Sequence, residues 1–112
     1  MPAYVKLQRI FCRRTEDTLN DEAYLRLNGT KVWGPVSVDD DSTTEINLLV
    51  EFAGQATVDL FDEDLGNFLD EDDFLGRHVV TELEAGMGDR HVRYTGDDAD
   101  YTLFYKVAVL DI

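Results

Sequence analysis

The sequence predicts an all-β fold, an eight-stranded antiparallel β-sandwich formed by a single domain over residues 1–112. Three observations predict this fold. Apolar residues recur at every second position in short segments, which is the period of a half-buried strand. The segments lie about eight to twelve residues apart with turn residues between them, a spacing typical of sandwiches. No segment shows the 3.6-residue period expected of a helix longer than two turns.

In each of the first four segments, apolar residues alternate with polar or charged ones. These apolar residues are, in chain order, Val5, Leu7 and Phe11; Leu25 and Leu27; Val36 and Val38; and Ile46, Leu48, Val50 and Phe52. Because side chains of a strand point alternately to its two faces, each set marks the face that is expected to enter the core. The strands predicted from them cover 5–11, 25–27, 31–38 and 45–52.

The last four segments follow the same pattern with different clarity. They are built on Val58 and Leu60, on residues 78–83, on residues 91–94 and on the set Leu103, Tyr105, Val107 and Val109. The segment 91–94 is the weakest of the eight. Turn sequences separate many of the strands, namely Asn28-Gly29, Gly54-Gln55, Gly86-Met87-Gly88 and Gly96-Asp97.

The few cysteine, histidine and large aromatic residues are expected to be structural. A single cysteine, Cys12, excludes an internal disulfide and follows the apolar Phe11, so a buried thiol is expected. His78 and His91 are too few for a catalytic zinc site. We expect three large aromatic residues to pack on the sheets, namely Trp33, Tyr101 and Tyr105.

The balance of charge limits the possible partners. The chain carries 24 acidic residues against 10 basic ones and a net charge of −14. Nucleic acid is therefore not an expected partner, since its phosphates must be neutralised by lysine and arginine. Anionic lipid is not expected to bind unaided. Solubility in high salt, or mimicry of nucleic acid, would also explain the acidity, but both predict acid that is spread over whole faces.

The acidic residues instead concentrate in alternate connections between the expected strands. Successive strands of an antiparallel sandwich run in opposite directions, so the first, third, fifth and seventh connections share one end. These connections and the residues flanking them hold 17 of the 24 acidic residues. Two carboxylates about 5 Å apart repel by roughly 3 kcal/mol at an effective dielectric constant of about 20. Such crowding favours a bound cation at that end.

The densest acid lies between the fifth and sixth expected strands. Residues 62–73 contain seven carboxylates, with aspartate at positions 62, 64 and 73. Calcium takes six to eight oxygen ligands and tolerates irregular geometry, whereas magnesium prefers a six-coordinate cage with retained water. An EF-hand is disfavoured because Asn67 stands where that loop requires glycine, and because the flanks are strands rather than helices. The residues therefore indicate a calcium site.

Two segments resemble the C2 domain, an eight-stranded sandwich that binds calcium. Asp62-Glu63-Asp64 followed by Asp73-Phe74-Leu75-Gly76 is similar to the third calcium loop of that family. The segment 21–27 is similar to the segment that follows its first loop, although Ala23 stands where the family has proline. Opening on the strand before the first loop would match the permuted, type II topology of the family.

The resemblance implies a set of calcium ligands. Asp62 and Asp64 match paired ligands at the end of a strand, while Asp70, Asp72 and Asp73 compete for one further role because the loop is longer than usual. From the first loop, Glu16-Asp17 lies where an earlier ligand is expected, and either Asp21 or Glu22 supplies another. The candidate metal ligands are therefore Glu16, Asp17, Asp21, Glu22, Asp62, Asp64, Asp70, Asp72 and Asp73.

The expected function is that of a calcium-binding module whose acidic loops switch binding to a membrane or to a protein partner. The alternative is a metal-independent acidic interaction or inhibitor protein that binds a basic partner. No enzyme is expected, since no catalytic triad and no glycine-rich phosphate loop is present. The sequence shows neither an apolar run of membrane-spanning length nor a signal peptide. A cytoplasmic location is the default expectation, and export as part of a larger assembly stays open.

Overall fold

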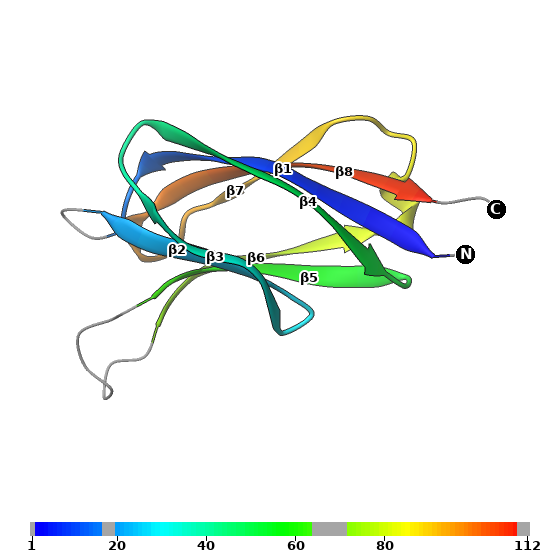
Figure 1. Ribbon diagram of the computed structural model, residues 1–112, viewed down its shortest axis with the longest axis horizontal. Coiled ribbons are helices and arrows are strands. Elements are labelled where there is room, and N and C mark those ends of the chain that lie inside the picture. The colour runs from blue at the N-terminus through cyan, green and yellow to red at the C-terminus, as the bar shows by residue number, and fades with distance from the viewer. Residues whose placement is uncertain (1, 17–19, 64–71, 110–112) are drawn as a thin grey trace.

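The computed structural model describes residues 2–16, 20–63 and 72–109, and these fold into two packed four-stranded sheets (Figure 1). The strands are β1 (Ala3–Arg14), β2 (Asp21–Leu27), β3 (Thr30–Val38), β4 (Ser42–Phe52), β5 (Gln55–Asp62), β6 (Asp73–Thr81), β7 (Arg90–Tyr94) and β8 (Asp100–Val109). Short 3₁₀ helices, η1 (Glu82–Glu84) and η2 (Gly96–Asp98), precede β7 and β8. The predicted eight-stranded antiparallel sandwich is confirmed.

The sheets have the strand orders β4-β1-β8-β7 and β3-β2-β5-β6, and every pairing is antiparallel. The chain crosses between the sheets after β1, β3, β4 and β6, and forms hairpins within one sheet elsewhere. The strands β1, β3, β5 and β7 consequently end, and β2, β4, β6 and β8 begin, at the same end of the sandwich, on the left in Figure 1. Among the described residues, none forms a helix with the length and apolarity needed to cross a membrane.

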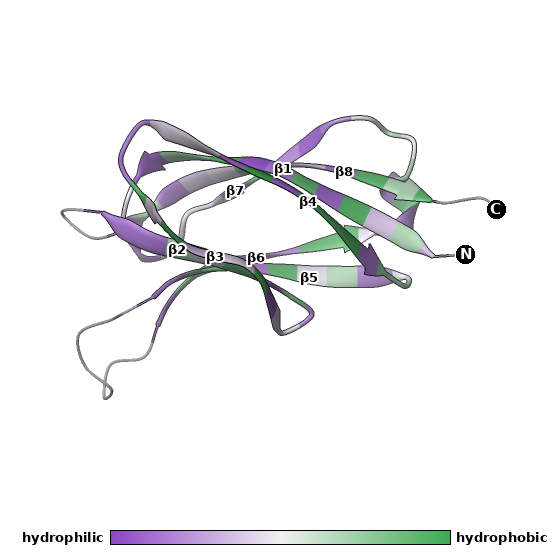
Figure 2. Cartoon of the chain, viewed as in Figure 1, coloured by the Kyte–Doolittle hydropathy of each residue, from purple (hydrophilic) through white to green (hydrophobic). Residues whose placement is uncertain are grey.

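Alternation of hydropathy along the strands builds the core, as the banding of β1, β4 and β8 in Figure 2 shows. Inward-facing residues of both sheets are buried, and the largest are Tyr94, Tyr101, Tyr105, Leu7, Ile10, Leu25, Leu60, Leu75 and Leu103. The Tyr94 hydroxyl of β7 donates a hydrogen bond to the carbonyl of Val58 in β5 at 2.9 Å, which joins the two sheets. Cys12 is 1% exposed, which confirms the expected buried thiol.

The structure corrects two expectations about the strands. In β1 the pairing shifts register between Leu7 and Arg9, so Ile10 and Cys12 are the buried residues that follow Leu7, and Phe11 is only half-buried. A bulge adds one residue and therefore inverts the alternation beyond it. The sixth strand covers Asp73–Thr81 rather than the predicted 78–83. It ends at Thr81 because Thr81 and Glu84 form a reciprocal capping box that starts η1.

Candidate metal centre

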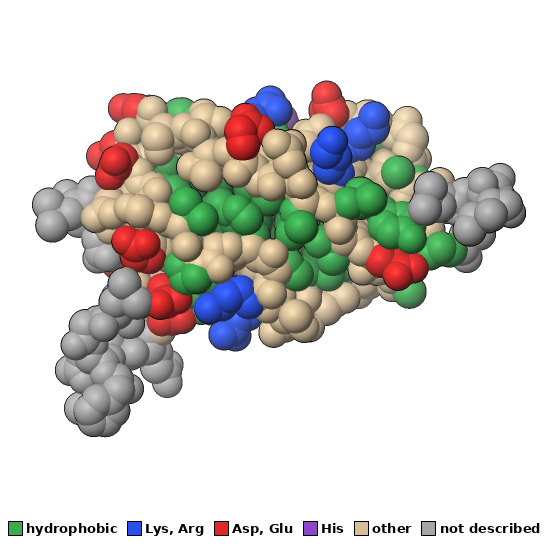
Figure 3. Space-filling model, viewed as in Figure 1, with side chains coloured by type: hydrophobic (Ala, Val, Ile, Leu, Met, Phe, Trp, Pro, Cys, Tyr) green, Lys and Arg blue, Asp and Glu red, His purple; other side chains and the backbone are tan. Residues whose placement is uncertain are grey.

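Carboxylates from several segments meet at the end of the sandwich where the odd-numbered connections lie. Acidic side chains are visible at this end on the left of Figure 3. Asp21 opens β2, Asp62 closes β5 and Asp73 opens β6, while Glu16 follows β1. Asp97 belongs to η2, before β8. The strand ends therefore bring together side chains that lie far apart in the sequence.

These side chains form two groups that share Glu16. In the first, single carboxylate oxygens of Glu16, Asp21 and Asp62 all lie within 4.8 Å of one another. In the second, single carboxylate oxygens of Glu16, Asp73 and Asp97 also lie within 4.8 Å of one another. We call the five residues the carboxylate cluster. At such distances each pair of charges repels by roughly 3 kcal/mol at an effective dielectric constant of about 20.

The first group is buried and held in place by hydrogen bonds. Asp21 and Asp62 are 0% and 1% exposed. The backbone N–H of Glu16 donates to Asp21 Oδ2 at 2.8 Å, and the backbone N–H of Glu22 donates to Asp62 Oδ1 at 2.8 Å. The first bond is local, whereas the second joins β2 to the end of β5. Both carboxylates are therefore oriented by the backbone of the first loop and of β2.

A buried tyrosine also supports this group. The Tyr101 hydroxyl donates to Asp21 Oδ2 at 2.5 Å. Burial, followed by the neighbouring Asp21 carboxylate, raises the pKa of Tyr101 far above its usual range, so the hydroxyl remains a donor. Sequence reasoning expected Tyr101 to pack on a sheet, which it does, but it contained no signal for this contact. The partners lie 80 residues apart.

The predicted ligands divide into three sets. The structure brings Glu16, Asp21, Asp62 and Asp73 together, and their roles as ligands remain predictions. Glu22 and Asp72 are in neither group of described residues, and Asp72 Oδ2 accepts a hydrogen bond from the Tyr24 hydroxyl at 2.5 Å. Burial and this carboxylate raise the pKa of Tyr24 to about 12. The predicted ligands outside the described residues are Asp17, Asp64 and Asp70.

Asp97 was not among the predicted ligands, although it was counted with the acidic end. A signal existed, because the turn at Gly96-Asp97 lies in the seventh connection. Asp97 has a left-handed backbone, with φ of 51° inside η2. A Cβ on Gly96 would lie 2.6 Å from the carbonyl oxygen of Leu75, so the absent side chain lets this turn pack closely against β6. That packing brings Asp97 near Asp73.

The chemistry of the donor set fits a hard divalent cation. All five residues of the cluster offer carboxylate oxygens, and neither group contains histidine or cysteine. Oxygen-only donors suit calcium and magnesium, whereas zinc prefers nitrogen and sulfur. The donors come from loops and strand ends, which tolerate the irregular, high-coordinate geometry of calcium better than the octahedron of magnesium. A calcium ion therefore fits the residues present.

Other acidic side chains near this end have cationic partners and serve the fold. Arg93 donates from Nη2 to Asp100 Oδ2 at 2.7 Å and from Nε to Oδ1 at 3.2 Å. These bonds hold the pKa of Asp100 below its usual range. Along β5, Asp59 receives two bonds from Arg77 at 2.8 and 2.9 Å. Asp59 and Asp100 are therefore held in ion pairs with arginine and lie outside the carboxylate cluster.

Comparison with known proteins establishes the fold. No protein-family model and no curated protein matches the sequence. A solved C2 domain superposes with a TM-score of 0.61 over 97% of this chain and 99% of its own, at 11% identity. A C2 domain of a plant extended synaptotagmin 1 gives a TM-score of 0.58 at 14% identity, covering 96% of this chain and 92% of that one.

A third similar structure is human group IVD cytosolic phospholipase A2, solved in complex with an inhibitor and terbium chloride. It matches 96% of this chain but 17% of its own length, with a TM-score of 0.57 and 18% identity. These likenesses cover nearly the whole chain at low identity, so they report on the fold. The predicted resemblance is confirmed at that level: this chain has the fold of a C2 domain.

Proposed function

We propose that this protein is a calcium-binding module whose carboxylate cluster is its metal site. The observation that carries the proposal is the meeting of Glu16, Asp21 and Asp62 within 4.8 Å, two of them buried. Burial of several like charges close together is unfavourable, and a cation between them removes the repulsion.

The residues would divide the work of binding. Asp21 and Asp62 are oriented before binding by backbone N–H groups, so they would provide fixed ligands. The other three residues, Glu16, Asp73 and Asp97, are less buried. They would close the site from the end of β1, the start of β6 and the turn before β8. Bound calcium would supply positive charge that neutralises these carboxylates. The acidic end would then no longer repel an anionic surface.

Removal of negative charge gives the module a switch. In chelator, the acidic end of a chain with a net charge of −14 repels anionic lipid and acidic protein surfaces. With calcium bound, we propose that this end docks on a membrane or on a protein partner. Sedimentation with anionic vesicles, with and without millimolar calcium, separates the two partners. Failure to sediment in calcium, in a protein that binds calcium, would leave the protein partner.

The first test is a thermal melt in chelator, in calcium and in magnesium. Calcium at 100 times its dissociation constant should stabilise by about 2.7 kcal/mol. For a domain of this size that is a rise in Tm of roughly ten degrees, and magnesium should have little effect. Asp21→Asn with Asp62→Asn should abolish the rise, whereas Glu51→Gln on the exposed face of β4 should not.

A melt that neither ion changes would contradict the proposal. The metal-independent alternative would then account for the acidity, since a strongly acidic surface can steer a basic partner electrostatically. That alternative predicts salt-sensitive capture of a basic protein in the presence of chelator. If the protein binds calcium, the rise in Tm with calcium does not require a basic partner.

A further inference from the structure

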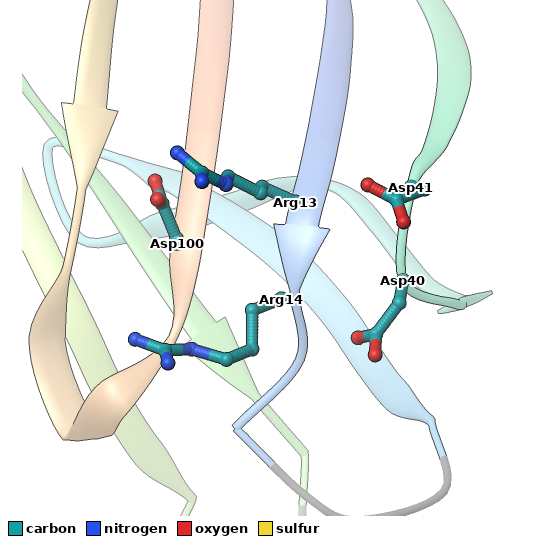
Figure 4. A pocket seen from close by; sticks show the side chains of 5 residues that line it. All are labelled: Arg13, Arg14, Asp40, Asp41 and Asp100. Carbon is teal, nitrogen blue, oxygen red and sulfur yellow. The ribbon is translucent and has the colours of Figure 1, made fainter.

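A second concave site lies at the same end of the sandwich as the carboxylate cluster. This pocket has a volume of about 560 Å³ and is lined by Arg13 and Arg14 of β1, Asp40 and Asp41 of the β3–β4 turn, and Asp100 of β8. Figure 4 shows both arginines extending from the end of β1 toward β8, with Asp40 and Asp41 on the other side of β1. All the lining residues are charged, and the charges are of both signs.

A β-bulge places two consecutive arginines in the same pocket. Adjacent residues of a regular strand point to opposite faces. The pairing of β1 with β8 shifts register between Cys12 and Arg14, which lie opposite Tyr101 and Asp100. After this shift, Arg13 and Arg14 are both exposed and both line the pocket. Bulges recur beside functional sites, where they redirect side chains.

In the described residues, neither arginine of the pocket forms an ion pair with a lining aspartate, although after the larger effect of Arg93 their charges also lower the pKa of Asp100. Asp100 is already held by Arg93, and Arg14 uses one of its five N–H donors on the carbonyl of Asp98 at 2.9 Å. In the described part of the chain, Arg13 forms no salt bridge. Arg14 also lacks one there. The two guanidinium groups therefore remain available to a ligand.

The opposite side of the pocket is negative and partly fixed. Asp40 Oδ1 accepts a hydrogen bond from the backbone N–H of Thr15 at 2.8 Å, which joins the turn to the end of β1. Asp41 is exposed, with a left-handed φ of 56°. No salt bridge in the described segments joins either aspartate to Arg13 or Arg14. If the arginines served only to neutralise the acidic end, such ion pairs would be expected.

We propose that this pocket binds a zwitterionic phosphate ester. Its phosphate would lie against the guanidinium groups of Arg13 and Arg14, whose planar forks match phosphate oxygens. Its ammonium group would lie toward Asp40 and Asp41. A simple anion would meet repulsion from the aspartates, and a simple cation would meet repulsion from the arginines. The volume is within the range of small-molecule sites. The site needs no calcium and is separate from the proposed metal centre.

The binding test is calorimetric titration in chelator, so that no metal ion bound at the carboxylate cluster contributes to the measured binding. Glycerophosphoethanolamine carries both charged groups, glycerol 3-phosphate lacks the ammonium and ethanolamine lacks the phosphate. We expect glycerophosphoethanolamine to bind at least about tenfold more tightly than either partial ligand. Absence of binding, or equal binding of glycerol 3-phosphate, would overturn the proposal without affecting the calcium proposal.

Variants locate the site. Arg13→Gln removes a guanidinium that forms no salt bridge in the described fold, and should weaken binding about tenfold or more. Lys6→Gln is the matched control, because Lys6 is exposed on the same strand and the substitution changes the net charge equally. Asp41→Asn keeps a residue that tolerates a left-handed backbone, and should weaken the zwitterion but not glycerol 3-phosphate. Equal effects of Arg13→Gln and Lys6→Gln would refute the site.

Vesicles distinguish the two sources of this chemical group. In chelator, sedimentation with vesicles of phosphatidylethanolamine and phosphatidylcholine, which carry zwitterionic headgroups and no net charge, but not with phosphatidylglycerol vesicles, would identify a lipid headgroup. Binding of soluble glycerophosphoethanolamine without sedimentation would identify a free phosphate ester. Arg13→Gln should abolish whichever binding is observed, and retention of that binding in this variant would exclude the pocket.

Discussion

Tyr101 shows how one hydroxyl group connects the core to the carboxylate cluster. Its ring is 0% exposed, and its hydroxyl donates to Asp21 Oδ2 at 2.5 Å. The same hydroxyl contacts the buried thiol of Cys12, whose pKa is raised by burial to about 11 and which therefore stays protonated. Because the backbone N–H of Glu16 donates to the same oxygen of Asp21, two donors fix the orientation of that carboxylate.

Replacing Tyr101 by phenylalanine should weaken calcium binding. A group that orients a metal ligand is typically worth ~10–100-fold in metal affinity, so calcium titration should show a dissociation constant raised by about tenfold or more. Tyr105→Phe is the control, since the Tyr105 hydroxyl donates to Glu84 Oε1 at 2.6 Å near η1. Both variants should lose ~1–3 kcal/mol of stability in chelator, but only Tyr101→Phe should change the affinity. Equal affinities would show that Tyr101 acts on folding alone.

At the scale of elements, β6 and β7 are edge strands of different sheets, and they meet where Gly76 packs against Tyr94. Gly76 in β6 has a φ of 152°, and a Cβ there would lie 2.7 Å from Tyr94 Cδ1. The Tyr94 hydroxyl continues across the core to the carbonyl of Val58. The missing side chain at position 76 is therefore what allows the tyrosine to join the sheets.

Gly76→Ala should destabilise the fold by about 2–4 kcal/mol, because the methyl group must displace a buried ring as well as strain the backbone. Gly54→Ala separates the two effects, since Gly54 also has a positive φ, of 72°, but a Cβ there meets nothing within 4 Å. We expect a loss of about 1 kcal/mol for that variant. Urea denaturation measures both, and equal losses would exclude the contact with Tyr94.

At the scale of the whole molecule, carboxylates are concentrated at one end of the sandwich rather than spread evenly. The carboxylate cluster lies at one end, while Figure 3 shows lysine and arginine side chains along the upper edge and at the lower left, with further acidic side chains along the upper edge and on the right. Lys6 and Lys106 are even opposite one another in the pairing of β1 with β8. Solubility does not require that five carboxylates meet at one end, whereas a cation site there accounts for the carboxylate cluster.

The stability of the calcium-free protein should therefore depend strongly on ionic strength. Salt at about 0.1 M screens charges beyond about 10 Å, and screening relieves the mutual repulsion of the acidic end. In chelator, Tm should rise by several degrees between low salt and about 0.5 M sodium chloride. In saturating calcium the same change of salt should have a smaller effect. A Tm in chelator that is independent of salt would show that the carboxylates do not repel significantly.

The sequence by itself determined the number of strands, their approximate positions and the end at which the acid gathers. This was possible because burial on one face imposes a period of two, and because strand direction alternates in an antiparallel sandwich. Even the weak segment 91–94 was identified, as β7. Asp21, Asp62 and Asp73 were predicted as ligands from the resemblance to the C2 domain, whereas periodicity alone placed the starts of the second and sixth strands later, at residues 25 and 78.

Only the tertiary structure decided which carboxylates meet and what supports them. The bulges near Gln8 and Arg13 depend on pairing with neighbouring strands, so they reversed the inward set of β1 and created the pocket with two arginines. Asp97 approaches Asp73 because Gly96 packs against Leu75, and Tyr101 reaches Asp21 across 80 residues. Such contacts leave no periodic trace, because their geometry is determined by how the two sheets pack rather than by neighbours along the chain.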